Sequence, residues 1–188
     1  MKQIYDKPIP TDPNYQIVYN EKRIEEMEEE IATIKSKRAT KSTPFILKEL
    51  EGRIKALKAY PKAQFEFTKD QYAPFDAYVK SEGRPEVIET IIEIKDRSVA
   101  STKYYDAQFE IGKLKKMIKI AQSRGINNII FMAHYTDNKT AIWDLKKYMN
   151  TTPVDFYSPY QTMGNNQMIL KQMILLPLNE AKIVERTI

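Results

Sequence analysis

Residues 86–95 constrain the fold of this chain more than any other segment. Six of these ten residues are isoleucine, valine or threonine. Such β-branched side chains pack well on a pleated surface and are enriched in strands. The segment is therefore predicted to be a central strand of a sheet, and we interpret the rest of the chain around it.

Weaker strand and helix signals lie on both sides of this segment. Strands are expected at residues 64–67, 74–80, 127–133 and 140–143. Residues 103–124 carry one apolar face at helical spacing and are followed by Gly125, so they are predicted to form a helix. A brief helix near residues 144–148 and a late hairpin of residues 157–163 and 167–176 complete a mixed α/β layer fold.

The first 60 residues are predicted to form an arm and a helical hairpin. Prolines at positions 8, 10 and 13 favour an extended arm over residues 1–19. Asn20 is the expected N-cap of a first helix, and Pro44 is placed to open a second helix that joins the core. The hairpin then spans residues 20–60, and residues 61–188 form an α/β core with a C-terminal β-hairpin. An apolar seam on the first helix indicates a coiled-coil hairpin or a homodimer contact; it consists of Ile24, Met27, Ile31 and Ile34.

The composition excludes several kinds of chemistry. The 188 residues include no cysteine and one histidine, which rules out disulfides, thiol nucleophiles and iron–sulfur clusters and makes structural zinc implausible. Metal chemistry would have to use carboxylates, which favour hard ions such as Mg²⁺ or Mn²⁺. No apolar run is long enough for a membrane span, and the N-terminus does not look like a secretion signal. A cytoplasmic protein without membrane contact is therefore expected.

Charged residues interrupt the apolar pattern near the end of the central strand. Side chains alternate between faces along a strand, so Glu93 and Lys95 share one face, opposite to that of the neighbouring isoleucines. The hairpin turn before this strand would bring Asp76 alongside Glu93. Two carboxylates can hold Mg²⁺, the Ile94 backbone carbonyl is a natural further ligand, and a neighbouring lysine can position water or stabilise charge on a phosphate. The alternative is a ladder of salt bridges on a half-exposed sheet.

At these residues the chain resembles the PD-(D/E)XK nuclease superfamily. Asp76, in the string Ala-Pro-Phe-Asp-Ala-Tyr-Val, matches the first aspartate of the motif, and Glu93-Ile94-Lys95 matches E-x-K. The resemblance covers roughly residues 44–145 and includes the order helix, β-hairpin carrying the motif, helix, strand. The string Ala-Ile-Trp-Asp-Leu-Lys-Lys is similar to one in small phage-encoded nucleases of this type. One departure is the phenylalanine between the proline and Asp76.

Members of this superfamily often add a glutamate from the preceding helix and polar residues from the following one. Glu51 flanks the buried face of the preceding helix and Glu49 lies on its outer face, so Glu51 is the predicted additional catalytic residue and metal ligand. Gln108, Glu110 and Lys113 are secondary candidates on the following helix, where Glu110 and Lys113 would be one turn apart. The alternatives are a solvated helix flank for Glu51 and an ordinary ion pair for Glu110 and Lys113.

Basic residues crowd the predicted helix of residues 103–124, and the chain as a whole has a formal net charge of +5. A basic face next to tyrosines can follow a phosphate backbone, although a solvated amphipathic face has the same composition. The candidates for nucleic-acid binding are Lys103, Lys115, Lys116 and Lys119.

The resemblance implies a restriction-endonuclease-like core, a central mixed sheet flanked by helices, that carries a Mg²⁺- or Mn²⁺-dependent deoxyribonuclease. The expected role is DNA processing or recombination in a phage or mobile element, which would place a phage-encoded protein in the host cytoplasm. The alternative is a non-catalytic module that binds nucleic acid or protein on the same fold.

Overall fold

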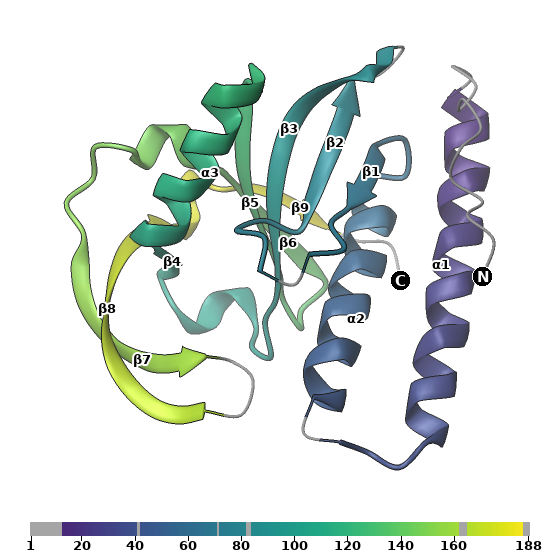
Figure 1. The fold of residues 1–188 in the computed structure, drawn as a ribbon, viewed down its shortest axis with the longest axis horizontal. Coiled ribbons are helices and arrows are strands. Elements are labelled where there is room, and N and C mark those ends of the chain that lie inside the picture. The colour runs from purple at the N-terminus through teal and green to yellow at the C-terminus, as the bar shows by residue number, and fades with distance from the viewer. Residues whose placement is uncertain (1–12, 41, 71, 82–83, 162–164, 186–188) are drawn as a thin grey trace.

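The computed structural model describes residues 13–40, 42–70, 72–81, 84–161 and 165–185 (Figure 1). The helices of these ranges are α1 (Pro13–Ser36), α2 (Thr43–Ala59) and α3 (Ile111–Arg124), with short 3-10 turns at η1 (Ser101–Lys103), η2 (Leu145–Tyr148) and η3 (Leu178–Glu180). The strands are β1 (Gln64–Phe67), β2 (Ala77–Ser81), β3 (Arg84–Asp96), β4 (Asp106–Glu110), β5 (Asn128–His134), β6 (Lys139–Asp144), β7 (Val154–Gln161), β8 (Asn165–Pro177) and β9 (Lys182–Glu185).

The strands form two sheets around the predicted central strand. Six of them follow the order β1-β2-β3-β5-β6-β9, and three follow the order β4-β8-β7. In the larger sheet β3 and β5 are parallel and the other pairs are antiparallel, because α3 connects β3 to β5 as a crossover. This architecture confirms a mixed α/β fold with a central mixed sheet flanked by helices.

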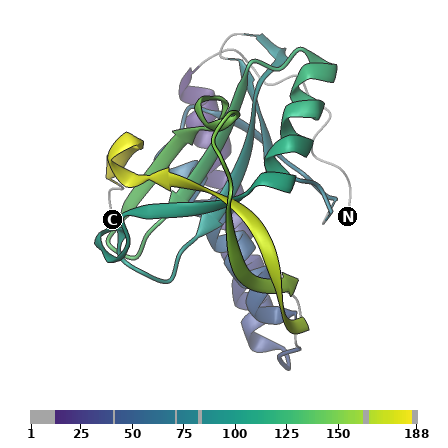
Figure 2. The same ribbon diagram turned by 90° about the vertical axis from the view of Figure 1, so that its left-hand side faces the viewer.

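The alternation of β3 creates two separate cores, one on each face of the larger sheet. Ile92 and Ile94 pack with Leu57 of α2 on one face. Ile91 packs on the other face with the buried Leu114 of α3 and with residues of the second sheet. Helices α1 and α2 therefore cover one face, while α3 covers the other (Figures 1 and 2).

Helix α1 begins at Pro13, seven residues before the predicted N-cap. The expectation of an extended arm was wrong for residues 13–19, and residues 1–12 of that arm lie outside the described ranges. Asn20 lies inside the helix, where it is 1% exposed and donates hydrogen bonds to the carbonyls of Pro61 (2.7 Å) and Ala63 (3.0 Å). A buried amide that satisfies two backbone carbonyls is worth more to this chain than a helix cap, because it fixes α1 on the body.

Helices α1 and α2 lie side by side as the predicted hairpin (Figure 1). Ile24 and Met27 of the apolar seam pack against the core that α2 shares with the sheet, and Ile31 and Ile34 are half-buried. The seam is thus used within the chain, and a homodimer contact through it stays a prediction. No helix in the described ranges is both long and apolar enough to cross a membrane.

The predicted helix of residues 103–124 begins too early. Residues 106–110 form strand β4, whose Ala107 and Phe109 are buried while Gln108 is exposed. This burial pattern has the period of a strand, and β4 pairs with β8 in the second sheet. The alternation of polar and apolar residues in 106–110 is itself a strand signal, but it is too short to outweigh the helical pattern that follows it, and pairing with β8 decides the structure.

The C-terminal hairpin is present as the antiparallel pair β7–β8, which curves away from the body (Figure 2). The predicted turn includes Gly164, which lies outside the described residues. Strand β9, which follows the hairpin and completes the larger sheet at β6, was not expected from the sequence.

The buried Asn20 yields a first test of this architecture. The Asn20→Ala variant should lose about 1–3 kcal/mol of unfolding free energy, because two carbonyls at the end of α2 lose their donor. Urea unfolding followed by circular dichroism measures this change. Asn150→Ala, at an exposed position, is the matched control. A loss equal to that of the control would mean that Asn20 does not anchor α1.

Candidate active site

Asp76 lies directly before β2 rather than on the predicted strand of residues 74–80, and its neighbour Ala77 pairs with Ile92 of β3. The Asp76 N–H donates to the Ile92 carbonyl (2.8 Å), which continues the β2–β3 pairing by one residue. Its Oδ2 accepts a hydrogen bond from the Ile94 N–H (2.6 Å). The carboxylate is thus held by the backbone of the strand that carries Glu93, and its position does not depend on a flexible side-chain contact.

Glu93 is a buried carboxylate in the middle of the larger sheet. It is 3% exposed; its Oε1 accepts a hydrogen bond from Lys113 and lies 3.9 Å from the Lys95 Nζ. Burial, followed by the charge of Asp76, raises the pKa of Glu93 to about 7, while Lys113 and Lys95 oppose that shift. Its Oε2 has no hydrogen-bond partner among the described residues. A buried carboxylate oxygen without a hydrogen-bond partner lowers the stability of the folded protein, and a bound cation would compensate for this loss.

The two lysines reach Glu93 from different elements. Lys95 lies two residues further along β3, and its side chain is 49% exposed. Lys113 comes from the first turn of α3, and its contact with Glu93 replaces the predicted pair with Glu110. That pair was wrong because Glu110 ends β4 rather than lying on the helix, and it binds Lys171 of β8 instead (3.2 Å). Gln108 is exposed on β4 opposite Leu175 of β8.

Glu51 does not join this cluster. Its side chain is 40% exposed and lies 4.0 Å from Lys35 of α1. Its neighbour Gly52 faces Ile94, so α2 packs on the face of the sheet opposite to Glu93. In the described ranges, no group of three or more histidine, cysteine, aspartate or glutamate side chains is placed to hold a metal ion. The carboxylate set of the candidate site is therefore Asp76 and Glu93.

Arg97 extends the charged row of β3 and was missed by the sequence analysis. Its N–H donates to the His134 carbonyl (2.8 Å), and its guanidinium lies 6.0 Å from the centre of the Phe131 ring. Burial lowers the pKa of Arg97, while the charges of Tyr135 and Glu93 oppose this. The alternation of side chains along a strand could have revealed Arg97, because a residue two positions after Lys95 lies on the same face of the sheet if the strand continues.

The basic residues of α3 leave the outer side of this helix positively charged. The helix contains four lysines and one arginine and no acidic residue, and Lys115, Lys116 and Lys119 are exposed. Lys103 is also exposed, but it lies in η1, where its Nζ is 5.6 Å from the centre of the Tyr104 ring.

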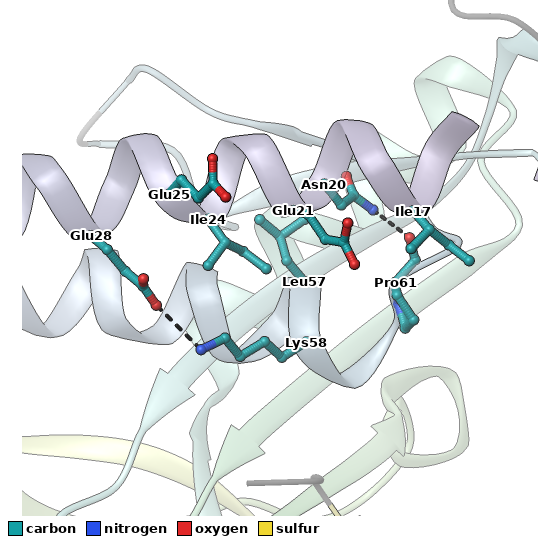
Figure 3. A pocket seen from close by; sticks show the side chains of 9 residues that line it. All are labelled: Ile17, Asn20, Glu21, Ile24, Glu25, Glu28, Leu57, Lys58 and Pro61. Carbon is teal, nitrogen blue, oxygen red and sulfur yellow. Dashed lines mark hydrogen bonds and ion pairs between the residues drawn. The ribbon is translucent and has the colours of Figure 1, made fainter. Parts of the chain in front are cut away.

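The opposite side of the molecule has a different charge. A hollow of about 450 Å³ between α1 and α2 is lined by Glu21, Glu25 and Glu28, and only Glu28 pairs there with a cation, Lys58 (3.2 Å; Figure 3). The outer side of α3 is thus basic, whereas the lining of the hollow is mainly acidic.

The residues present fit a hard divalent cation. Mg²⁺ is commonly bound by one or two carboxylates, with water and substrate phosphate in the other positions, so Asp76 and the unpartnered Oε2 of Glu93 are sufficient. The Ile94 N–H points to the Asp76 side of β3, and a carbonyl points to the same side as the N–H of its own residue in an antiparallel pair. The Ile94 carbonyl therefore also faces the Asp76 side of β3.

The raised pKa of Glu93 predicts a pH-dependent stability in metal-free protein. When folding raises the pKa of a carboxyl group, that group stabilises the folded protein at pH values below its pKa in the unfolded chain. This contribution to stability is lost as the pH rises through the pKa of the folded protein. Between pH 4 and pH 8 the wild type should therefore lose up to about 3 kcal/mol relative to Glu93→Gln. Urea unfolding in EDTA at both pH values measures this difference.

Glu29→Gln makes the same chemical change on the exposed face of α1 and serves as control. A constant stability difference between wild type and Glu93→Gln at both pH values would contradict the burial argument.

Comparisons with known proteins provide no independent assignment. No protein-family model, curated protein or solved structure matches the chain. The chemistry of the site must therefore be argued from the geometry of Asp76, Glu93, Lys95 and Lys113 and from the resemblance of the motif.

Proposed function

We propose that the chain is a divalent-metal-dependent nuclease that hydrolyses phosphodiester bonds of DNA. The observation that carries this proposal is the buried, unpartnered Oε2 of Glu93 opposite Asp76, with Lys95 on the same face of β3. The fold buries the Glu93 carboxylate although this burial is unfavourable for stability. Ionisable groups in such unfavourable surroundings are typical of functional sites.

The order of the elements supports a restriction-endonuclease-like core. Helix α2 precedes the three antiparallel strands β1–β3, β3 carries Glu93 and Lys95, and α3 leads to β5, which runs parallel to β3. Strand β4 is inserted between β3 and α3 and belongs to the second sheet. Glu93 and Lys95 on β3 and Asp76 directly before β2 are consistent with the hairpin that the resemblance implies.

The chain's own residues would share the work of hydrolysis. Asp76 and Glu93, with the Ile94 carbonyl, would hold Mg²⁺ or Mn²⁺, which supplies charge neutralisation and a more acidic water when bound. Lys95 is exposed enough to reach a substrate and would orient the attacking water or stabilise the negative charge that develops on the phosphate oxygens. Lys113 would fix the orientation of the Glu93 carboxylate through its hydrogen bond.

The lysines of α3 would hold the DNA backbone next to this site. Lys113 touches Glu93, and Lys115, Lys116 and Lys119 follow it on the same helix and are exposed. Contacts from lysine to phosphate supply sequence-independent affinity that falls with salt concentration. The processing or recombination of phage or mobile-element DNA is the role that we propose for such an enzyme.

One observation favours a second function, binding without cleavage. The Lys113 ammonium already pairs with Glu93 Oε1, so the buried carboxylate is partly neutralised without a metal ion. A protein that keeps this pair permanently would hold nucleic acid on the same surface and leave it intact.

The proposal predicts cleavage that depends on metal and on Asp76. A panel of linear duplex, single-stranded, branched and supercoiled DNA is incubated with Mg²⁺ or Mn²⁺, and products are resolved on denaturing gels. The wild type should cut at least one substrate, and Asp76→Asn should reduce the rate about 100-fold or more. Asparagine keeps an oxygen to accept from the Ile94 N–H, so the strand pairing is retained.

Asp155→Asn, on the exposed surface of β7, should cut like the wild type. Binding without cutting by the wild type on every substrate would replace the nuclease by the binding module.

Lys95 can be tested separately from the carboxylates. Lys95→Ala should lower the single-turnover cleavage rate about 100-fold, because a charge next to the reacting phosphate is removed. Its affinity for DNA in EDTA should fall by no more than that of Lys62→Ala, which removes an exposed lysine elsewhere. An unchanged cleavage rate would exclude Lys95 from the reaction.

A further inference from the structure

Arg97 occupies the same face of the sheet as the candidate site. Glu93 and Lys95 alternate with Ile94 on β3, and the Arg97 N–H continues the pairing of this strand with β5. The side chain of Arg97 therefore follows Glu93 and Lys95 in one row, and its guanidinium lies over the ring of Phe131, which pairs with Glu93.

The support beneath this guanidinium is rigid. Phe131 is 2% exposed and stacks on Trp143, with ring centres 5.5 Å apart. The Trp143 Nε1 donates to the Pro177 carbonyl (2.8 Å), which fixes the indole at the junction of the two sheets. An arginine that lies on such a platform has lost much of its freedom before any ligand arrives, so less entropy is lost on binding.

The charges of Glu93 and Tyr135 act on the Arg97 guanidinium from a distance. It forms no ion pair and donates no side-chain hydrogen bond to another described residue. The other arginines that lie over rings differ in this respect. Arg53 lies over Phe67 but pairs with Glu49, and Arg124 lies over Tyr78 but donates to its hydroxyl. The hydrogen-bond donors of Arg97 are therefore available to an anionic ligand, and the partial burial of the side chain would strengthen that interaction.

We propose that Arg97 forms a phosphate-binding subsite beside the Asp76–Glu93 pair and holds one phosphate of a nucleic-acid backbone. The planar fork of a guanidinium matches two phosphate oxygens, which the single ammonium of Lys95 does not. This inference rests on the proposed function for the identity of the polymer, and it names a contact that orients the backbone without reading its sequence.

The test is DNA binding in EDTA, where no cleavage takes place. Fluorescence anisotropy with two labelled 20-nucleotide single strands of unrelated sequence, and their duplexes, is measured between low and moderate salt. Arg97→Gln should weaken binding about tenfold or more for both sequences and lower the slope of log K against log salt by about one. Arg97→Lys should keep most of the slope while binding more weakly than the wild type.

Arg53→Gln is the matched control, because it removes a guanidinium that also lies over a ring but already has a partner. It should change the salt slope little. Thermal unfolding of each variant shows whether the fold is intact, and Arg97→Lys keeps the test valid if Arg97→Gln does not fold. An unchanged slope and affinity in a folded Arg97 variant, a loss confined to one sequence, or no DNA binding by the wild type would overturn the subsite.

Failure here is distinguishable from failure of the nuclease proposal. A protein that holds DNA through Arg97 but never cuts it would pass the binding test and fail the cleavage test. Cleavage that depends on Asp76 but is indifferent to Arg97 would give the opposite result.

Discussion

The burial of Glu93 is the constraint on which the rest of this structure depends. A carboxylate at 3% exposure in a central strand must be compensated, because desolvation of its charge is unfavourable. Lys113 compensates one oxygen, Asp76 adds a second negative charge, and Oε2 remains unpartnered in the described structure. Alternation along β3 then separates this charged face from the apolar face of Ile92 and Ile94. The Glu93 face also contains the buried Ile91, so β3 contributes to a core on each face of the sheet and carries the candidate chemistry near its C-terminal end.

Different helices cover these two faces of the larger sheet. Helices α1 and α2 cover the apolar face and are fixed to the body by the Asn20 amide and by the Lys55–Asp96 ion pair (2.6 Å). Helix α3 covers the other face, where its first turn places Lys113 at Glu93 and its outer side carries exposed lysines. The acidic hollow lies between α1 and α2 (Figure 3), on the opposite face of the larger sheet from this basic helix (Figure 1). The basic residues of α3 and the acidic lining of the hollow therefore lie on opposite faces of the larger sheet.

Local patterns were sufficient for β3, for the α1–α2 hairpin and for the proximity of Asp76 to Glu93, because periodicity and hairpin distance decide these features. Local patterns failed where pairing or packing with a segment far away in the sequence determines the structure. Residues 106–110 carry helix-compatible side chains but become β4 because β8 pairs with them, and this moved Glu110 off the helix. Glu51 was assigned by helical phase, which cannot tell which face of the sheet the helix covers. Arg97 was missed because the predicted strand ends at Lys95, whereas β3 runs to Asp96 and the Arg97 N–H continues the pairing with β5.

A direct titration with Mn²⁺ followed by electron paramagnetic resonance tests the proposal that Asp76 and Glu93 form a site for one divalent cation. The account predicts one bound Mn²⁺ per chain for the wild type, and binding at least about tenfold weaker for Asp76→Asn, because a charged ligand is removed. Absence of bound Mn²⁺ in the wild type at millimolar concentration, or equal binding by the two proteins, would contradict it.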